Sequence, residues 1–415
     1  MRIESFRVQG FKSLADVKVD GLSEINVFYG LNGVGKSNIF QALALWNWTL
    51  TTIQSSRAGM PLSRLEAIFG SSLFQLGGNK AIKLRVGITL NIDSPLGEVV
   101  NKHTAQRNPD LAIKNRVQVT SEIEIDSRPD EVSFLIKSWA EIAKSGRVNI
   151  PQEEIVEVLP GFHIIKATRR LQIEQRGRGK DLGPISDHNL KQALFYAYLS
   201  RDLQQKRRLE AIRRILTEPP FSLGELDIAL DPTTDQIDIG FVRSDGRLPL
   251  ENLGSGSQQL LLVLGQIFLN DYPIIAIEEP EMNLSPQYQQ WLLVALRELM
   301  QDPDVKLNQL FISTHSPYFE FEENFFDVTM DEQGVTQVAK LPLEKRNRYF
   351  PDTEIGQETG ARLNSLNQVK LYDGVIQDLK LQRGDMVIFT KNEAGRWEIR
   401  PESEIVEELE TVSDN

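Results

Sequence analysis

The feature that most constrains this chain is residues 30–37, which read Gly-Leu-Asn-Gly-Val-Gly-Lys-Ser and fit the pattern Gly-x-x-x-x-Gly-Lys-Ser. The apolar residues 24–29 precede this stretch and predict a short strand. Residues 38–46 follow it with apolar side chains at three- and four-residue spacing, which predicts a helix. Strand, glycine-rich turn and helix in this order favour a phosphate-binding loop in an α/β fold.

Each residue type in this loop has a chemical role. Glycines let the backbone turn its N–H groups toward phosphate oxygens, and the helix start adds partial positive charge. Lys36 can reach the β- and γ-phosphates, and the Ser37 hydroxyl can bind Mg²⁺. A chance match is the alternative, but strand, loop and helix agree. The predicted nucleotide-binding residues here are Gly30, Asn32, Gly33, Val34, Gly35, Lys36, Ser37 and Asn38.

Two later apolar runs end in residues suited to ATP hydrolysis. Residues 273–277 lead to Glu278 and Glu279, and residues 310–312 lead toward His315. Such runs are typical of strands buried on both faces of a parallel sheet, and ligands bind beyond their carboxyl ends. We interpret Glu278 as a metal ligand, Glu279 as the residue that polarises the attacking water, and His315 as a γ-phosphate donor. A solvated loop for the glutamates and a structural role for the histidine are the alternatives.

Composition excludes several classes of protein and site. The 415 residues contain no cysteine and four histidines, which excludes disulfides and thiolate metal sites and disfavours a multi-histidine zinc site. No apolar run approaches the ~18 residues that cross a bilayer, and the first residues lack a signal-peptide core, so we expect a cytoplasmic protein without membrane contact. The net charge of −12 opposes a uniformly nucleic-acid-binding surface but allows a local basic patch.

The pattern along the chain predicts three regions. Residues 1–344 should form a head with a helical, basic insertion at about 128–216, in which we expect helices at 128–145 and 190–216. Residues 345–401 should form a small β-rich module, and residues 402–415 an acidic tail. Residues 166–214 contain thirteen Lys and Arg against five Asp and Glu. This basic segment indicates either a contact with nucleic acid or an acidic partner, or a solvated helical face.

Taken in order, five motifs resemble those of the ABC-type ATPase domain, and more narrowly those of the SMC/RecF/OLD-like ATPases, often filed as AAA-family proteins. They are Gly-Phe-Lys-Ser at 10–13, the loop at 30–38, Leu-Gly-Ser-Gly-Ser-Gln-Gln at 253–259, Ile-Glu-Glu-Pro-Glu at 277–281 and Ser-Thr-His-Ser-Pro at 313–317. The resemblance covers most of residues 1–342. It implies a P-loop NTPase with a mixed or parallel core sheet, an antiparallel β-subdomain and a helical insertion.

The resemblance also implies ATP and Mg²⁺ as cofactors and a role for each central residue. Lys36 would bind phosphate, while Ser37 and Glu278 would bind Mg²⁺. Glu279 would orient the attacking water, and His315 would be the switch histidine. One departure is Glu278, which stands where Asp is more usual in the family.

Further contacts would lie at the edges of the nucleotide and in a second subunit. In the family two heads enclose two ATP molecules, which implies a homodimer or higher oligomer. Ser255 and Gly256 would contact the ATP of the opposite subunit, and Lys12 and Ser13 would lie near the adenine or ribose. The motif before the later helix reads Leu-Gly-Ser-Gly-Ser rather than Leu-Ser-Gly-Gly-Gln. Gln75 is the candidate for the glutamine loop.

Together these features predict a soluble ATPase whose ATP-driven head engagement controls a separate effector protein, in DNA maintenance and repair or in anti-phage defence. One alternative is a nucleotide-gated scaffold with negligible turnover. Another is the nucleotide-binding subunit of a membrane transporter, which typically keeps Leu-Ser-Gly-Gly-Gln. Residues 367–401 resemble the AbrB-like swapped-hairpin module over about 35 residues; a simple hairpin appendage is the alternative there.

Overall fold

The chain consists of two compact units, Met1–Pro342 and Leu343–Asn415, each described here by itself. The structure is a computed structural model. It describes residues 2–53, 57–74, 81–91, 94–107, 116–128, 130–142, 146–156, 158–159, 161–167, 169, 174, 183–302, 305–316, 324–341, 379–380, 387–391 and 397–401. Gln75, the predicted acidic tail and most of the predicted AbrB-like module lie outside these residues.

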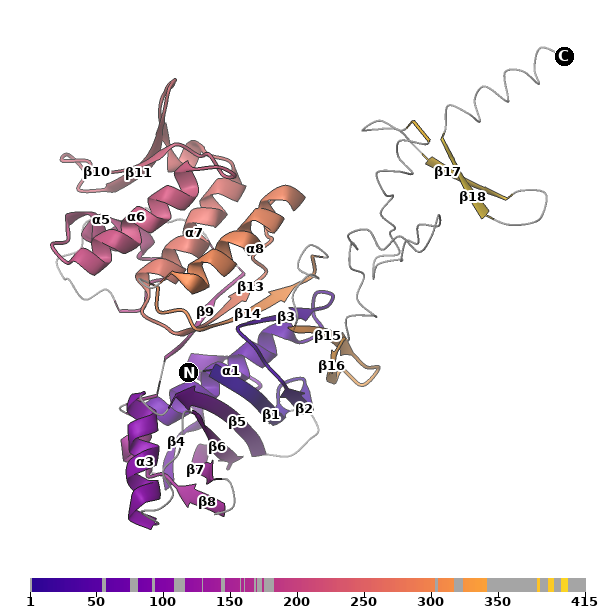
Figure 1. Cartoon of the computed structure of the whole chain (residues 1–415). Helices are drawn as coiled ribbons and strands as arrows, with labels where there is room; N and C mark the ends of the chain where they lie inside the picture. The colour runs from indigo at the N-terminus through magenta and orange to yellow at the C-terminus, as the bar shows by residue number, and fades with distance from the viewer. Residues whose placement is uncertain are drawn as a thin grey trace. The chain divides into compact units, whose positions relative to one another are not determined.

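A six-stranded sheet forms the core of the first unit (Figure 1), in the order β16-β15-β3-β14-β13-β9. All neighbouring strands are parallel except β16, which runs antiparallel to β15. The carboxyl ends of the parallel strands therefore share one edge of the sheet. The strands are β3 (Ile25–Tyr29), β9 (Phe162–Ile165), β13 (Ile274–Glu278), β14 (Gln309–Thr314), β15 (Asn324–Met330) and β16 (Thr336–Lys340).

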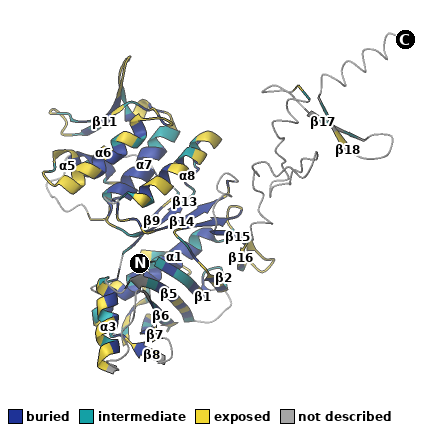
Figure 2. Ribbon diagram, viewed as in Figure 1, coloured by how far each residue is buried: buried dark blue, intermediate teal, exposed yellow. Residues whose placement is uncertain are grey.

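Alternate residues of the core strands face two different hydrophobic clusters. Phe28 and Phe311 pack with helix α1 (Lys36–Thr52) on one face. Val27 and Ile277 pack on the other face, with α7 (Ser255–Leu269) and α8 (Pro286–Gln301). Both faces are covered, so the middle residues of these strands are mostly apolar, as the continuous apolar runs predicted. Figure 2 shows β14 and most of β13 as buried. Burying one such side chain contributes roughly 1.5–3 kcal/mol to stability.

The second large sheet is antiparallel, in the order β2-β1-β5-β6-β7-β4, with β8 paired to β7. Residues from this sheet and from α1 share one hydrophobic cluster with the core sheet, so α1 joins the two sheets. The turn between β1 and β2 holds the Gly-Phe-Lys-Ser motif. The strands are β1 (Arg2–Phe11), β2 (Leu14–Asp20), β4 (Arg57–Pro61), β5 (Ala81–Asn91), β6 (Arg116–Ser127), β7 (Glu131–Ile142) and β8 (Gly146–Asn149). Three shorter helices accompany them: α2 (Leu62–Phe69), α3 (Pro95–Arg107) and α4 (Gln152–Val156).

Helices cover the other face of the core sheet, with a small sheet beyond them. The helix predicted at 190–216 is two helices, α5 (Leu190–Leu199) and α6 (Leu203–Thr217), which pack with α7. Strands β11 (Ile237–Arg243) and β12 (Gly246–Pro249) form an antiparallel hairpin. Strand β10 (Glu225–Leu230) completes that sheet, and the short 3-10 helix η1 (Leu250–Asn252) follows it.

The helix predicted at 128–145 is wrong, because β7 occupies this region. Val132, Ile136 and Trp139 fit helical spacing, but Val132, Phe134 and Ile136 also alternate, and β6 pairs with β7 from residue 132 to residue 141. Pairing along most of a 12-residue strand outweighs a weak local helical preference. The insertion at 128–216 is likewise not wholly helical, since β7 and β8 belong to the antiparallel sheet and β9 to the core sheet.

In the second unit, β17 (Val387–Lys391) and β18 (Trp397–Pro401) form an antiparallel pair. The AbrB-like resemblance stays a prediction. In the described parts of both units, no helix combines the length and the apolar character that crossing a membrane requires.

Candidate active site

The loop at 30–37 follows β3 and depends on its glycines. Gly33 has φ 84° and Gly35 has φ 97°, both in the left-handed region that favours glycine. A Cβ on Gly35 would lie 2.1 Å from Thr336 Oγ1, and a Cβ on Gly30 would lie 2.2 Å from the Val328 carbonyl oxygen. The loop is therefore held tightly against β15 and β16, and larger residues at these two positions would displace it.

A small hydrogen-bond network supports the loop from behind. Thr336 Oγ1 donates to the Val34 carbonyl at 2.8 Å and lies 2.6 Å from Ser13 Oγ. Asn38 Nδ2 donates to Ser13 Oγ at 2.8 Å. Ser13 and Asn38, both predicted to be nucleotide-binding residues, thus connect the β1–β2 turn, α1 and β16. These bonds give the two side chains a role in shaping the loop.

Lys12 lies in the same turn and adopts φ 51°. Its ammonium group donates to Gln41 Oε1 at 2.5 Å and to the Phe69 carbonyl at 2.9 Å. Burial lowers the pKa of this amine. Lys12 therefore joins the turn to α1 and α2, and a contact between Lys12 and nucleotide stays a prediction.

Lys36 opens α1 and is buried, with 5% of its surface exposed. Its Nζ donates to the carbonyl oxygens of Gly30 and Leu31, at 2.5 and 2.8 Å. Burial lowers the pKa of Lys36, while the charges of Glu279 and Glu281 act in the opposite direction. Within the described residues no side chain caps the start of α1, so its first N–H groups remain available to an anion.

Glu278 and Glu279 lie at the carboxyl end of β13, on the same sheet edge as the loop. Only β14 separates β13 from β3, so the two strand ends lie roughly 10 Å apart at ordinary strand spacing. An amide N–H, that of Ala167, donates to Glu278 Oε2 at 3.3 Å. Glu279 has φ 44°, a strained value for a non-glycine residue that costs on the order of 1–3 kcal/mol. Its N–H donates to the Ser313 carbonyl at 2.8 Å.

His315 follows β14, between these two strand ends, and Glu281 fixes its position. Glu281 Oε1 accepts bonds from Thr314 Oγ1 at 2.7 Å and from the His315 N–H at 2.8 Å, and lies 3.1 Å from His315 Nδ1. The carboxylate favours a proton on Nδ1, which leaves Nε2 for another ligand. The other oxygen, Glu281 Oε2, is buried and has no hydrogen-bond partner among the described residues.

The start of α7 carries the remaining predicted contacts. Ser255 is exposed, and within the described residues no side chain caps this helix either. A Cβ on Gly256 would lie 2.9 Å from the Asn283 carbonyl, so the start of α7 packs against the loop that follows Glu279. Ser255 and Gly256 are thus positioned on a free helix end, and their contact with a partner's ATP stays a prediction.

Three residues with structural roles at the site were missed from the sequence: Arg169, Glu281 and Thr336. Glu281 lies in the Ile-Glu-Glu-Pro-Glu motif at 277–281, but the sequence alone did not indicate its contact with His315. Arg169 follows the apolar run of β9, and a cation just beyond a buried strand could have drawn attention. Thr336 carried no signal, because it approaches the loop only through the pairing of β15 with β16 and of β15 with β3.

Some cations of the basic segment at 166–214 make contacts within the protein, so fewer of them can contact nucleic acid than the sequence suggested. Arg208 is buried and lies 2.5 Å from Asp271, so it is not a surface cation. Arg213 donates to Glu210 at 2.8 Å and stacks on Tyr198. Residues 170–173 and 175–182, which contain several of the counted cations, lie outside the described residues. Nucleic-acid contact through residues 166–214 stays a prediction.

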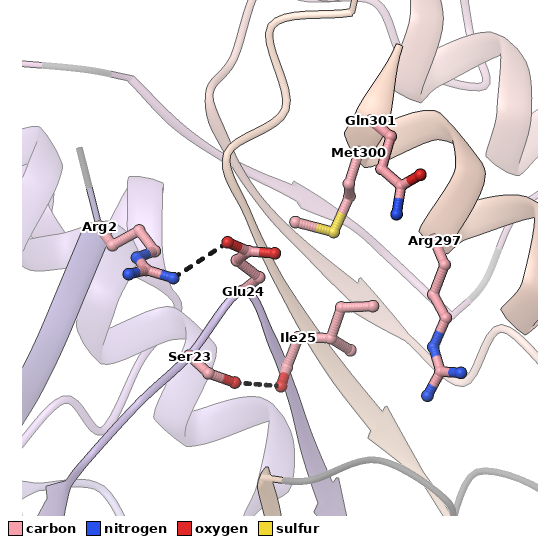
Figure 3. Close-up of a pocket in the computed structure, with 7 residues that line it drawn as sticks. All are labelled: Arg2, Ser23, Glu24, Ile25, Arg297, Met300 and Gln301. Carbon is pink, nitrogen blue, oxygen red and sulfur yellow. Dashed lines mark hydrogen bonds and ion pairs between the residues drawn. The ribbon is translucent and has the colours of Figure 1, made fainter.

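A hollow of about 530 Å³ lies at the other end of β3 (Figure 3). Ser23, Glu24 and Ile25 line it where β3 begins, together with Arg2 and the end of α8, and Arg2 pairs with Glu24 at 3.2 Å. The phosphate-binding loop follows the opposite, carboxyl end of the same strand. This hollow is therefore separate from the candidate active site.

The donor set at the candidate site suits Mg²⁺ bound together with a nucleotide. Ser37 and Glu278 offer oxygen atoms, which Mg²⁺ prefers, and this ion usually takes few protein ligands besides phosphate oxygens and water. Across the described ranges no group of three or more His, Cys, Asp or Glu side chains could hold a metal alone. Phosphate oxygens would complete the coordination that Ser37 and Glu278 begin.

Comparison with known proteins agrees with this geometry. The family model for an AAA ATPase domain matches residues 1–319. The chain belongs to the AAA ATPase domain family. The predictions of a P-loop ATPase with an α/β core and an antiparallel sheet are therefore confirmed, and the family binds nucleotide.

Curated relatives of this AAA ATPase are distant. A protein of Helicobacter pylori described as an ATP/GTP phosphatase is 21% identical over 374 residues, covering 86% of this chain and 96% of that protein. Uncharacterized protein MJ1542 of Methanocaldococcus jannaschii is 26% identical over 197 residues, covering 45% of this chain and 24% of its own length. The chain thus matches about a quarter of the length of MJ1542.

Solved structures similar to this AAA ATPase include SMC head domains. One is an SMC head bound to the C-winged helix domain of ScpA, 17% identical, with a TM-score of 0.48, covering 83% of this chain and 99% of that one. Another is the SMC head domain from Thermotoga maritima, 15% identical, with a TM-score of 0.44, covering 83% and 100%.

Proposed function

We propose that this AAA ATPase hydrolyses ATP at the edge of the core sheet where the loop at 30–37, Glu279 and His315 meet. The observation that carries the proposal is that the loop after β3, His315 after β14 and Glu279 after β13 follow three neighbouring parallel strands at one edge of the core sheet. A phosphate-binding cation and the candidate catalytic carboxylate are thus close enough to act on one triphosphate. The likeness to an ATP/GTP phosphatase over 86% of the chain supports the same reading.

Each group has a task in this proposal. The uncapped start of α1 and Lys36 bind the β- and γ-phosphates, and bound Mg²⁺ neutralises the developing charge. Ser37 and Glu278 hold that ion. Glu279 orients the attacking water and accepts a proton from it. His315 contacts the γ-phosphate through Nε2 while Glu281 holds Nδ1.

The proposal extends to a dimer in which each head completes the other's site. The start of α7 offers exposed N–H groups and Ser255 to an anion, and we place the γ-phosphate of the partner's ATP there. ATP would then join two heads and hydrolysis would release them. This cycle would control a separate effector, in DNA maintenance or anti-phage defence.

Replacing Glu279 with Gln tests the catalytic assignment. Glu279→Gln should reduce phosphate release by about 10²–10³-fold, since the amide cannot accept the proton of water. It should retain ATP binding and accumulate an ATP-dependent dimer, measured by light scattering. Glu298→Gln, a change in α8 that carries no assigned role, is the matched control and should behave as wild type.

The outcomes separate the proposal from its alternatives. Unchanged phosphate release in Glu279→Gln would reject the role of Glu279. Tight ATP binding by a wild-type protein without turnover would favour a nucleotide-gated scaffold instead. Measuring phosphate release with GTP as well as with ATP shows whether the protein discriminates between the two nucleobases.

A further inference from the structure

Arg169 is a buried cation at the junction of three elements that form the candidate site. It follows β9 and has 4% of its surface exposed. Its guanidinium donates to the Glu278 carbonyl at 2.8 Å, to the Glu279 carbonyl at 2.9 Å and to the Lys166 carbonyl at 2.7 Å. The planar group thus binds the backbone of Glu278, the candidate metal ligand, and of Glu279, the candidate catalytic residue, through a fixed set of donors.

A fourth guanidinium donor reaches α7. Arg169 Nε donates to Gln259 Oε1 at 2.9 Å, and Gln259 Nε2 donates back to the Arg169 carbonyl at 3.1 Å. Gln259 is itself buried, with 6% exposed. It stands four residues after Ser255, one turn into the helix. The start of α7 is therefore joined to the backbone of Glu278 and Glu279 through one arginine.

The conformation of Glu279 depends on such restraints. Its left-handed φ of 44° is unfavourable for a residue with a side chain, and it persists only where neighbouring groups hold it. The Ser313 carbonyl holds the Glu279 N–H, and the Glu279 carbonyl accepts bonds from Arg169 at 2.9 Å and from the Met282 N–H at 3.1 Å. Removing the Arg169 bond would leave only the Met282 bond on this carbonyl, so the peptide after Glu279 would be held less firmly and the carboxylate could shift with it.

A second contact couples the same two regions. Gly256 approaches the Asn283 carbonyl so closely that a Cβ would lie 2.9 Å from it. The start of α7 and the loop after Glu279 are therefore packed backbone against backbone. A shift of the helix start would reach this loop both through this packing and through Arg169.

We propose that Arg169 and Gln259 are positioning residues that transmit nucleotide engagement at the start of α7 to the orientation of Glu279. When the partner's ATP contacts the start of α7, the link through Gln259 and Arg169 sets the Glu279 backbone for hydrolysis. This inference rests on the proposed function, because Glu279 must be the catalytic carboxylate and α7 must meet a second head.

Gln259→Leu tests the link with little change in volume. It should lower kcat about tenfold and leave the KM for ATP within about twofold. The increase in turnover per subunit with rising protein concentration should become smaller. Gln259→Glu keeps an acceptor for Arg169 and should recover most of kcat. Gln266→Leu is the matched control, because Gln266 is another buried glutamine of α7, whose side chain bonds to the Leu262 carbonyl of its own helix and to His163 of β9.

A double variant separates a link from a general loss of stability. Arg169→Lys should resemble Gln259→Leu in kcat, and combining the two should add little, because both break one connection. If Gln259→Leu and Gln266→Leu lower the melting temperature equally and both keep wild-type kcat, the link is rejected although Glu279 remains catalytic. Additive losses of kcat would reject it too. Undiminished turnover by Glu279→Gln would overturn the proposed function and this inference together.

Discussion

The starts of α1 and α7 differ from the starts of α6 and α8. Asp202 accepts a bond from the Gln204 N–H at the start of α6, and Ser285 caps α8 in the same way. Within the described residues no side chain does this for α1 or α7, where Gly35 and Gly254 occupy the cap positions. In the same described part of the chain, the starts of α2 and α5 also lack a side-chain cap, but their cap positions hold Pro61 and Asn189. The glycine-capped starts of α1 and α7 coincide with the predicted phosphate contacts, whereas α6 and α8, with their side-chain caps, are structural helices.

This contrast shows how the fold reserves donors for a ligand. A side-chain cap typically stabilises a helix by about 1 kcal/mol, so its omission has a cost. The N–H groups that remain unbonded in the protein can bind phosphate instead. In the described part of this AAA ATPase, α1 and α7 lack this cap, and the proposed function needs an anion site at both of these helix starts.

The largest effect is expected for Lys36→Ala, which removes the cation at the start of α1. Turnover should fall by about 100-fold or more, because no other cation of the described loop can replace Lys36 against the γ-phosphate. Phosphate release and ATP titration would measure this change. If Lys36→Ala kept the ATP affinity and the turnover of wild type, the start of α1 would not be part of the nucleotide site.

An intermediate effect is expected when α7 is made to resemble α6. Gly254 has φ −56°, and no described atom lies within 4 Å of a Cβ built on it, so Gly254→Asp should fold. The aspartate would cap α7 and raise the free energy of unfolding by a few tenths of a kcal/mol, yet repel phosphate. ATP-dependent dimerisation should weaken by about tenfold, as sedimentation can measure.

Gly254→Ala is the control for this change, since it adds a Cβ without a cap and should dimerise as wild type. If Gly254→Asp stabilises the protein and leaves dimerisation intact, the start of α7 is not an anion site. In that case the start of α7 would not share the anion-binding role proposed for the start of α1.

The smallest effect is expected at a structural helix start. Asp202→Ala removes the cap of α6 and should lower the free energy of unfolding by about 1 kcal/mol, measured by urea denaturation. ATP turnover should not change, because Asp202 takes no part in the proposed site. A loss of turnover larger than the loss of stability explains would show that α6 also serves the nucleotide site.

Much of the core could be predicted from the sequence because its signals are local. The apolar runs before the loop and before Glu278 and Glu279 predicted β3 and β13. Strand β3 is buried throughout, and β13 is buried up to the partly buried Glu278 at its end. The region of β7 could not be predicted correctly, because Val132 and Ile136 fit both helical and extended spacing. The extended conformation is selected by pairing with β6, which the local sequence does not reveal.

Local sequence was enough to predict the phosphate-binding loop, the buried strands and the polar residues at their ends, because each depends on neighbours a few positions away. Which of these residues act together depends on the three-dimensional fold. Arg169 meets Gln259 across 90 residues, and Thr336 reaches Val34 across 302. Such partners are chosen by strand order and burial, which place a lone arginine and a lone threonine where their hydrogen bonds hold the site.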